Sequence, residues 1–215
     1  MFYNFIENYW MKKIVLFILI CMPFAGLTQR FNGGILAGGL VSQVDGDTWS
    51  GYHKFSFYGG ALVSLQVSQR SSFQMEMEYI QKGSRQNGDT ATNTGMTYLL
   101  RLHYLEIPVL YQFAFHKRFS AEIGPAADVL LGSTELVNNM EPISTVPLRP
   151  VTLSGIIGIN GYITTHLRLN FRLNYSVLSI RNGVANGYRR IVFEVGQYNN
   201  VISFGLIWDF YPKDL

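Results

Sequence analysis

Apolar and polar side chains alternate strictly over residues 72–83, which read SFQMEMEYIQKG. Phe73, Met75, Met77 and Tyr79 occupy every second position, and Gln and Glu stand between them. A period of two predicts a β-strand, because successive side chains leave a pleated backbone on opposite faces. One face of this strand is apolar and the other is charged, as in a soluble sheet over a core or in a membrane barrel with a polar lumen.

Eight amphipathic runs of this kind recur along the chain, at residues 31–44, 52–68, 71–83, 97–114, 118–131, 150–164, 166–180 and 200–211. Several exceed ten residues, whereas globular strands average about 5–6 and a tilted membrane strand needs about 9–11. Long polar connections, such as residues 84–96, alternate with very short ones near Gln69-Arg70, His116-Lys117 and Thr164-Thr165. This sorting is typical of outer-membrane barrels. We therefore predict an all-β fold, an eight-stranded antiparallel up-and-down transmembrane β-barrel, over residues 29–215.

A basic and apolar segment precedes the first predicted strand. Residues 11–29 read MKKIVLFILICMPFAGLTQ, in which two lysines are followed by an apolar run and then by small and turn-forming residues. This order predicts a secretory signal peptide over residues 11–28, and we interpret residues 1–10 as a spurious N-terminal extension. A membrane anchor is the alternative, although a span needs about 18 apolar residues. Cys21, the single cysteine, lacks the small preceding residue that a lipidation signal requires.

The charge balance bears on possible partners. The full chain has 17 Lys and Arg against 14 Asp and Glu, and the signal segment with the extension accounts for two of the bases and one of the acids. A nearly neutral chain gives no indication of nucleic-acid binding, which usually needs a concentrated basic surface. Charged residues make up 14% of the chain and aromatic residues 14%. Soluble domains carry about 25% charged residues, so the composition also favours a membrane barrel.

Aromatic residues mark the ends of the predicted strands. Phe73 and Phe113 fall near one membrane interface and Tyr79 and Tyr98 near the other. Further aromatic residues at strand ends on outward rows are Phe55, Phe119, Tyr175 and Phe210. Rings with a polar edge prefer the headgroup region, so these residues are interpreted as two aromatic girdles. The core of a soluble β-sandwich is the alternative interpretation.

Ionisable residues on the opposite rows are predicted to face the lumen. Strand parity assigns to this inward set Lys54, Glu76, Glu78, Lys82, Arg101, His103, Glu122, Asp128, Arg168 and Arg172. Glu106 joins the set if a bulge near Tyr104-Leu105, or the fixed φ of Pro108, turns it inward. Side chains can just fill an eight-stranded barrel, so these five acids and five bases should pair. We predict a structural salt-bridge network, with a proton or solute path along the same residues as the alternative.

Three motifs occur in a particular order. They are the segment from Gly33-Gly34 to Lys54, the sequence EYIQKGS at 78–84 and the sequence YLEIP at 104–108. Their order and spacing resemble the small outer-membrane β-barrel proteins of Bacteroidetes known as the PorT or porin-like family. The resemblance extends over essentially Gln29 to Leu215. It implies an outer-membrane barrel and implies no reaction.

The sequence offers no catalytic constellation. His116 and His166 fall at the short turns and His53 beside the first long loop, which leaves His103 alone in the interior of a predicted strand. No serine motif or metal-ligand spacing accompanies it. Glu76 and Glu78 are interpreted as lumen carboxylates that pair with cations. Asp45-Gly46-Asp47 is interpreted as a polar turn.

We therefore expect a structural or interaction protein of the outer membrane that is not an enzyme and has no cofactor or metal. It should be monomeric, contact outer-membrane lipid and bind an envelope or secretion protein. The alternatives are a narrow, porin-like transport channel and a membrane-embedded hydrolase.

Overall fold

The computed structural model describes residues 31–47, 49, 51–88, 95–142, 146–182, 188–189 and 195–212. The predicted N-terminal extension, signal peptide and Cys21 lie outside these residues. The strands are β1 (Phe31–Asp45), β2 (Lys54–Gln66), β3 (Ser71–Gln86), β4 (Tyr98–His116), β5 (Phe119–Val137), β6 (Val151–Tyr162), β7 (Leu167–Ser176), β8 (Arg181–Asn182), β9 (Tyr188–Arg189) and β10 (Val195–Asp209). No helix among the described residues is long and apolar enough to cross a membrane.

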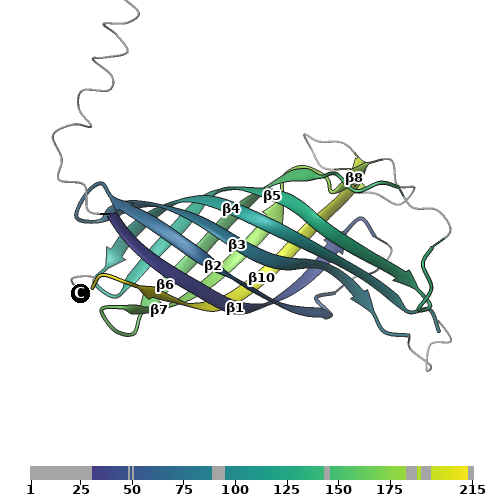
Figure 1. Ribbon diagram of the computed structural model, residues 1–215, viewed down its shortest axis with the longest axis horizontal. Coiled ribbons are helices and arrows are strands. Elements are labelled where there is room, and N and C mark those ends of the chain that lie inside the picture. Colours follow the sequence, from purple (N-terminus) through teal and green to yellow (C-terminus); the bar gives the residue numbers. More distant parts are fainter. Residues whose placement is uncertain are drawn as a thin grey trace, which may run out of the picture. The chain divides into compact units, whose positions relative to one another are not determined.

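Eight of these strands close into a barrel (Figure 1). Each strand from β1 to β6 pairs antiparallel with the next one, β7 pairs with β10, and β10 pairs back with β1 from Gly34↔Asp209 to Asp45↔Tyr198. The two-residue strands β8 and β9 pair only with the first residues of β10. The predicted eight-stranded antiparallel up-and-down barrel is therefore confirmed.

The connections differ sharply between the two ends of the barrel. At one end, called the short-turn end here, residues 67–70, 117–118 and 163–166 join β2 to β3, β4 to β5 and β6 to β7. The first residues of β1 and the last of β10 meet at this end (Figure 1). The other four connections lie at the opposite, long-loop end. There β4 and β5, each of 19 residues, extend beyond the start of β6.

The outer wall of the barrel is apolar and the inner wall is largely polar. On β3, Phe73, Met75 and Met77 are 48%, 51% and 59% exposed, whereas the intervening Gln74 and Glu76 are 1% exposed. A continuous apolar wall of this kind is not sustained in water and matches a surface that faces lipid. The outward rows of all eight strands carry large apolar residues in the same way, among them Ile35, Phe57, Val109, Ile123, Ile157, Phe171, Leu173, Phe204 and Leu206.

The aromatic residues at the strand ends follow the predicted girdles with one exception. Phe55, Phe119 and Phe210 are exposed on the outer wall. Tyr98 is instead 8% exposed inside the barrel, where its ring stacks on Trp49 at 6.2 Å between ring centroids. The girdle interpretation is therefore wrong for Tyr98, because inward residues of β4 form an apolar layer at this level.

Glycines make room for large side chains inside this narrow barrel. The Tyr58 ring lies across the backbone of the neighbouring strands, and a Cβ built on Gly38 would come within 2.6 Å of its Cε1 atom. Tyr58 belongs to an apolar cluster that lines the inner wall of β1 and β2 and continues at the long-loop end. The inner wall from β3 to β7 carries most of the polar groups.

Candidate functional site in the barrel interior

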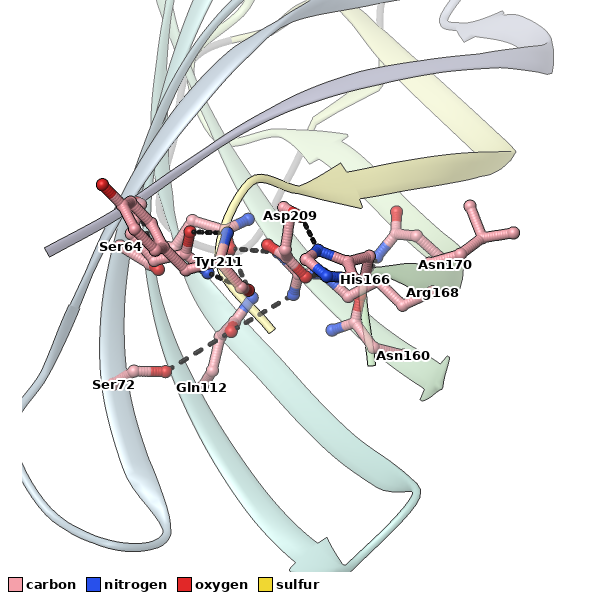
Figure 2. Close-up of polar contacts among 12 residues, drawn as sticks. Ser64, Ser72, Gln112, Asn160, His166, Arg168, Asn170, Asp209 and Tyr211 are labelled. Carbon is pink, nitrogen blue, oxygen red and sulfur yellow. Dashed lines mark hydrogen bonds and ion pairs between the residues drawn. The ribbon is translucent and has the colours of Figure 1, made fainter. Parts of the chain in front are cut away.

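Three polar clusters lie along the interior, and the first is at the short-turn end. Here the Arg168 Nε lies 3.1 Å from an Asp209 oxygen, and Arg168 Nη2 donates to Gln74 Oε1 at 2.7 Å. Gln112 donates to the same Gln74 oxygen at 3.1 Å. Figure 2 shows Arg168 beside Asp209, with His166 next to them, and the His166 Nδ1 donates to the Asp209 backbone oxygen at 2.8 Å. The interior is therefore occupied by a paired arginine at this end.

The second, central cluster is built around Arg172 of β7. Its two terminal nitrogens reach both carboxylate oxygens of Glu76 on β3, at 2.6 and 2.7 Å, and its Nε donates to Glu122 on β5 at 2.6 Å. Glu78 lies farther away, with 3.9 Å between its Oε2 and Arg172 Nη1. All four side chains are 3% exposed or less. One guanidinium therefore neutralises two carboxylates and holds three strands together.

Side-chain amides satisfy the remaining oxygens of the central cluster. Asn170 and Asn160 donate to Glu122 at 2.8 Å each, and Gln112 donates to it at 3.0 Å. Gln74 donates to Glu76. Buried charges are tolerated when such partners complete their hydrogen bonds, because an unpaired buried charge costs several kcal/mol.

The third cluster surrounds Lys82 of β3 nearer the long-loop end. The ammonium pairs with Glu106 on β4 and with Asp128 on β5, the latter at 3.0 Å. Asn174 of β7 donates to Glu106 at 2.7 Å. The Tyr104 ring lies 5.6 Å from the Lys82 nitrogen. Lys82, Glu106 and Asp128 are each 1% exposed or less, so the whole cluster is buried in the interior.

An apolar layer covers the third cluster on the side of the long loops. Its members are Leu40, Leu100, Leu102, Tyr104, Ile180 and Tyr198, all 2% exposed or less. Beyond this layer, Arg181 pairs with Glu135 at 2.9 Å, and Glu135 also accepts a hydrogen bond from Tyr98 at 2.9 Å. Lys54 lies at the same end, and its ammonium donates to the Ser56 hydroxyl at 2.5 Å.

Nine of the eleven residues predicted to face the lumen are buried in the interior, at 3% exposure or less. Arg101 and His103 are the two exceptions, and the prediction is wrong for both. Arg101 is exposed on the outer wall, and His103 is half-buried there with its Nδ1 2.5 Å from the Tyr79 hydroxyl.

The phase of β4 explains these errors. Leu100, Leu102, Tyr104 and Glu106 all point inward without interruption, so the bulge predicted near Tyr104-Leu105 does not re-aim Glu106. The irregularity lies on β5, where the partner changes from Gly132 opposite His103 to Leu130 opposite Tyr104. The rule that polar residues face inward holds only where the outer wall meets hydrocarbon. Above that level the inner row of β4 is apolar, and its outer row can carry Arg101.

The loss of Arg101 from the interior changes the charge balance. The spanning part of the inner wall has six carboxylates, of Glu76, Glu78, Glu106, Glu122, Asp128 and Asp209. It has three bases, Lys82, Arg168 and Arg172, while Lys54 lies nearer the long-loop end. Glu78 lies directly opposite Glu106 in the strand register and two residues after Glu76, and its Oε2 has no hydrogen bond within the described residues. It is therefore the carboxyl with the weakest compensation.

Sequence reasoning also missed several members of the clusters. Asp209 falls within the predicted strand at 200–211 but was not assigned to the lumen, and neither were the amides of Gln74, Gln112, Asn160, Asn170 and Asn174. A signal for two of them was present. The segment LRLNFRLN of β7 places Arg168, Asn170, Arg172 and Asn174 on one face by simple alternation.

Among the described residues, no group of three or more His, Cys, Asp and Glu side chains is arranged to hold a metal ion. The buried acids are instead bound to arginine, lysine and amide groups. These ion pairs and hydrogen bonds fill the interior and join opposite strands.

A closed ring of eight antiparallel strands with an apolar outer wall and a polar, side-chain-filled interior defines a transmembrane β-barrel. The chain belongs to the family described as outer membrane protein beta-barrel domain, whose sequence profile matches residues 26–182. It is an integral protein of the outer membrane.

Solved structures of small outer-membrane barrels resemble this fold. Neisserial surface protein A is 11% identical, with a TM-score of 0.49 over 86% of this chain and 100% of that one. The attachment invasion locus protein Ail of Yersinia pestis is 10% identical, with a TM-score of 0.45 over 84% and 99% of the two chains. OprG from Pseudomonas aeruginosa is 12% identical, with a TM-score of 0.40 over 85% and 95%. No curated protein matches the sequence significantly.

Proposed function

We propose that this protein is a non-enzymatic, monomeric anchor in the outer membrane that presents its long loops to a partner in the cell envelope. The observation that carries the proposal is the filled interior. The cation Arg172 and the carboxylates that it binds are 3% exposed or less, and the clusters around Arg168 and Lys82 lie on either side of them. A barrel whose cross-section is occupied by paired charges has no bore for the diffusion of nutrients.

The arrangement of the ionisable side chains gives little support for an enzymatic function. His103, which lies within β4, is on the outer wall and contacts the Tyr79 hydroxyl. A general base needs an oriented neighbour and access to substrate. The carboxylates of the interior lack that access, since Glu76 and Glu122 are each 1% exposed.

The finer classification follows from sequence motifs. The sequences EYIQKGS and YLEIP support membership of the PorT or porin-like barrels of Bacteroidetes, and we propose a role in secretion or at the cell surface on that basis. In the structure the first motif supplies Glu78 and Lys82, and the second supplies Tyr104 and Glu106, all of which are buried in the interior. The motifs therefore coincide with residues that fill the barrel.

Planar-bilayer recording tests whether the lumen conducts. We expect refolded protein, whose folding is verified by its shifted mobility on an unheated gel, to give no conductance steps above the bare bilayer. The apolar layer of Leu100 and Leu102 and the cluster around Lys82 should block ions. Reproducible steps with ion selectivity would contradict the anchor and support the narrow channel.

Surface labelling tests which end faces outward. Peptide tags inserted at Asn87-Gly88 and at Asn138-Asn139, both at the long-loop end, should bind antibody on intact cells. A tag at Lys117, at the short-turn end, should bind antibody only after the membrane is opened. Labelling of Lys117 on intact cells would show that the long loops do not face the exterior and would remove the basis for a surface partner.

A further inference from the structure

Among the described residues, the exposed charged side chains at the short-turn end are all basic. Arg70 lies in the β2–β3 turn, and Lys117 and Arg118 form the β4–β5 turn, and all three are exposed. We call these three residues the basic turns. Asp209, the described acid of this end, is 4% exposed and pairs with Arg168. The partly or fully exposed acids of the described chain, Asp45, Asp47, Glu135 and Glu141, belong to the long-loop end.

The basic turns are neighbours on the ring. Strands β3 and β4 pair from Ser71↔Phe113 onward, and the Ala114 amide donates to the Arg70 carbonyl at 2.7 Å. The Tyr162 amide donates to the Arg118 carbonyl at 2.9 Å. These backbone bonds fix both turns to the rim, so their side chains extend from one side of it.

An aromatic wall lies directly beside the basic turns. Phe113, Phe115 and Phe119 are 42%, 56% and 46% exposed on the outer face, and the rings of Phe115 and Phe119 stack at 6.4 Å. Aromatic rings of this kind mark the boundary between hydrocarbon and headgroups. Lys117 follows Phe113 by four residues, which places it up to about 13 Å farther along an extended chain. The charges therefore extend past the rings, toward the side on which a bilayer has its headgroup phosphates.

We propose that the basic turns bind the phosphate of an anionic phospholipid, with its acyl chains against the wall of Phe113, Phe115 and Phe119. The site goes beyond the role of the long loops, because it is at the opposite end of the barrel. A phospholipid satisfies both halves of the surface at once, whereas an acidic protein would meet only the charges. Each basic residue near an anionic lipid surface contributes about fivefold in affinity.

Native mass spectrometry of the refolded protein in a maltoside detergent tests the proposal. The full chain is titrated with short-chain phosphatidylglycerol, with phosphatidylcholine of the same chain length, with inorganic phosphate and with polyglutamate. We expect phosphatidylglycerol to bind at least tenfold more tightly than phosphatidylcholine. The double variant Arg70→Gln/Arg118→Gln should lose roughly 20-fold in affinity for phosphatidylglycerol.

The matched control is Arg85→Gln/Arg101→Gln, which removes two exposed arginines from the other end of the barrel. It should bind phosphatidylglycerol like the parent protein. Equal loss in both double variants, or equal binding of the two lipids, would show general charge attraction and overturn the site. Full competition by inorganic phosphate at the lipid's concentration would assign the site to free phosphate. Binding of polyglutamate through Arg70 and Arg118, without a preference for phosphatidylglycerol, would assign it to an acidic protein.

Discussion

The Arg172 guanidinium reaches Glu76 across the full width of the barrel, with both terminal nitrogens within 2.7 Å of the carboxylate. These residues lie on β7 and β3, which are four strands apart in either direction around the ring. The contact therefore joins opposite walls that share no backbone hydrogen bonds. A narrow lumen makes this cross-brace possible, because the two side chains together span it.

Replacement of Arg172 by Gln should destabilise the barrel strongly. The carboxylates of Glu76 and Glu122 would lose their cation while remaining buried, which costs about 3–5 kcal/mol. Urea unfolding in lipid vesicles measures the change. The triple variant Arg172→Gln/Glu76→Gln/Glu122→Gln should recover much of the loss, since it leaves no unpaired charge at this level.

Arg101→Gln is the control for this substitution. Arg101 was expected in the lumen from strand parity, but it is exposed on the outer wall, so its replacement should change the free energy of unfolding by less than about 0.5 kcal/mol. A loss as large as that of Arg172→Gln would show that Arg101 does take part in the buried network.

Glu78→Gln should leave the barrel as stable as before or make it more stable at pH 7.5. The pairing of five acids with five bases that the sequence predicts would give Glu78 a cation of its own and make this change destabilising. In the structure Arg172 is 3.9 Å away and already binds Glu76, while Glu106 faces Glu78 directly. An amide of similar volume removes a like charge at the cost of one weak contact. A loss above about 2 kcal/mol in urea unfolding would mean that Glu78 carries a full ion pair.

The period-two pattern, the length of the amphipathic runs and the alternation of long and short connections were together sufficient to predict the barrel and its strands. Each strand must place one row against lipid, so hydrophobic side chains such as Met75 and Met77 fix the register from the sequence alone. The same rule failed for Arg101, because β4 continues beyond the hydrocarbon, where both rows can be polar or apolar.

The pairing inside the lumen could not be predicted. Which cation meets Glu76 depends on how the ring closes, and Arg172 is 96 residues away in the sequence. The balance of charge in the lumen also differs from the expected one, because Arg101 lies on the outer wall and Asp209 lies inside. Local alternation gives the wall that a side chain faces, but three-dimensional closure determines its partner.

The lipid face offers a direct test of the outward row. Met77 is 59% exposed on the outer wall of β3, between Met75 and Tyr79. Met77→Arg should destabilise the inserted barrel by roughly 2–4 kcal/mol if this level is near the midplane of the bilayer, whereas Met77→Leu should be nearly silent. Both are measured by urea unfolding from vesicles. Equal tolerance of the two changes would show that this row does not meet hydrocarbon.

Asp47, in the loop after β1, should make stability depend on pH. Burial raises the pKa of Asp47 to about 6, although hydrogen bonds from the Ser84 hydroxyl and the Trp49 amide oppose the shift. A raised pKa means that the folded state holds the proton more tightly, so this contribution is complete below about pH 4 and is lost as the pH rises through 6.

Asp47→Asn should abolish this decrease and stabilise the protein by about 1–3 kcal/mol at pH 7.5. Urea midpoints at pH 4.5 and pH 7.5 provide the comparison. Glu141→Gln, an exposed acid at the same end, should leave the difference between the two midpoints unchanged. An identical pH dependence in Asp47→Asn and the parent protein would show that Asp47 is not the responsible group.

Gly158 provides the space in which the central cluster forms. It lies on β6 between Glu122 of β5 and Arg172 of β7 in the strand register, and a Cβ there would be 2.9 Å from Glu122 Oε1 and 3.0 Å from Arg172 Cγ. The same Cβ would approach the Phe171 carbonyl within 2.7 Å. Gly158→Ala should therefore destabilise the barrel by about 1–3 kcal/mol in urea unfolding, because the pair must separate. Gly155→Ala on the same strand is the control, because a Cβ there would meet only Val177, at 3.8 Å, and the change should be neutral. Equal effects of the two alanines would indicate a general cost of replacing glycine on this strand, and no specific effect on the Glu122–Arg172 contact.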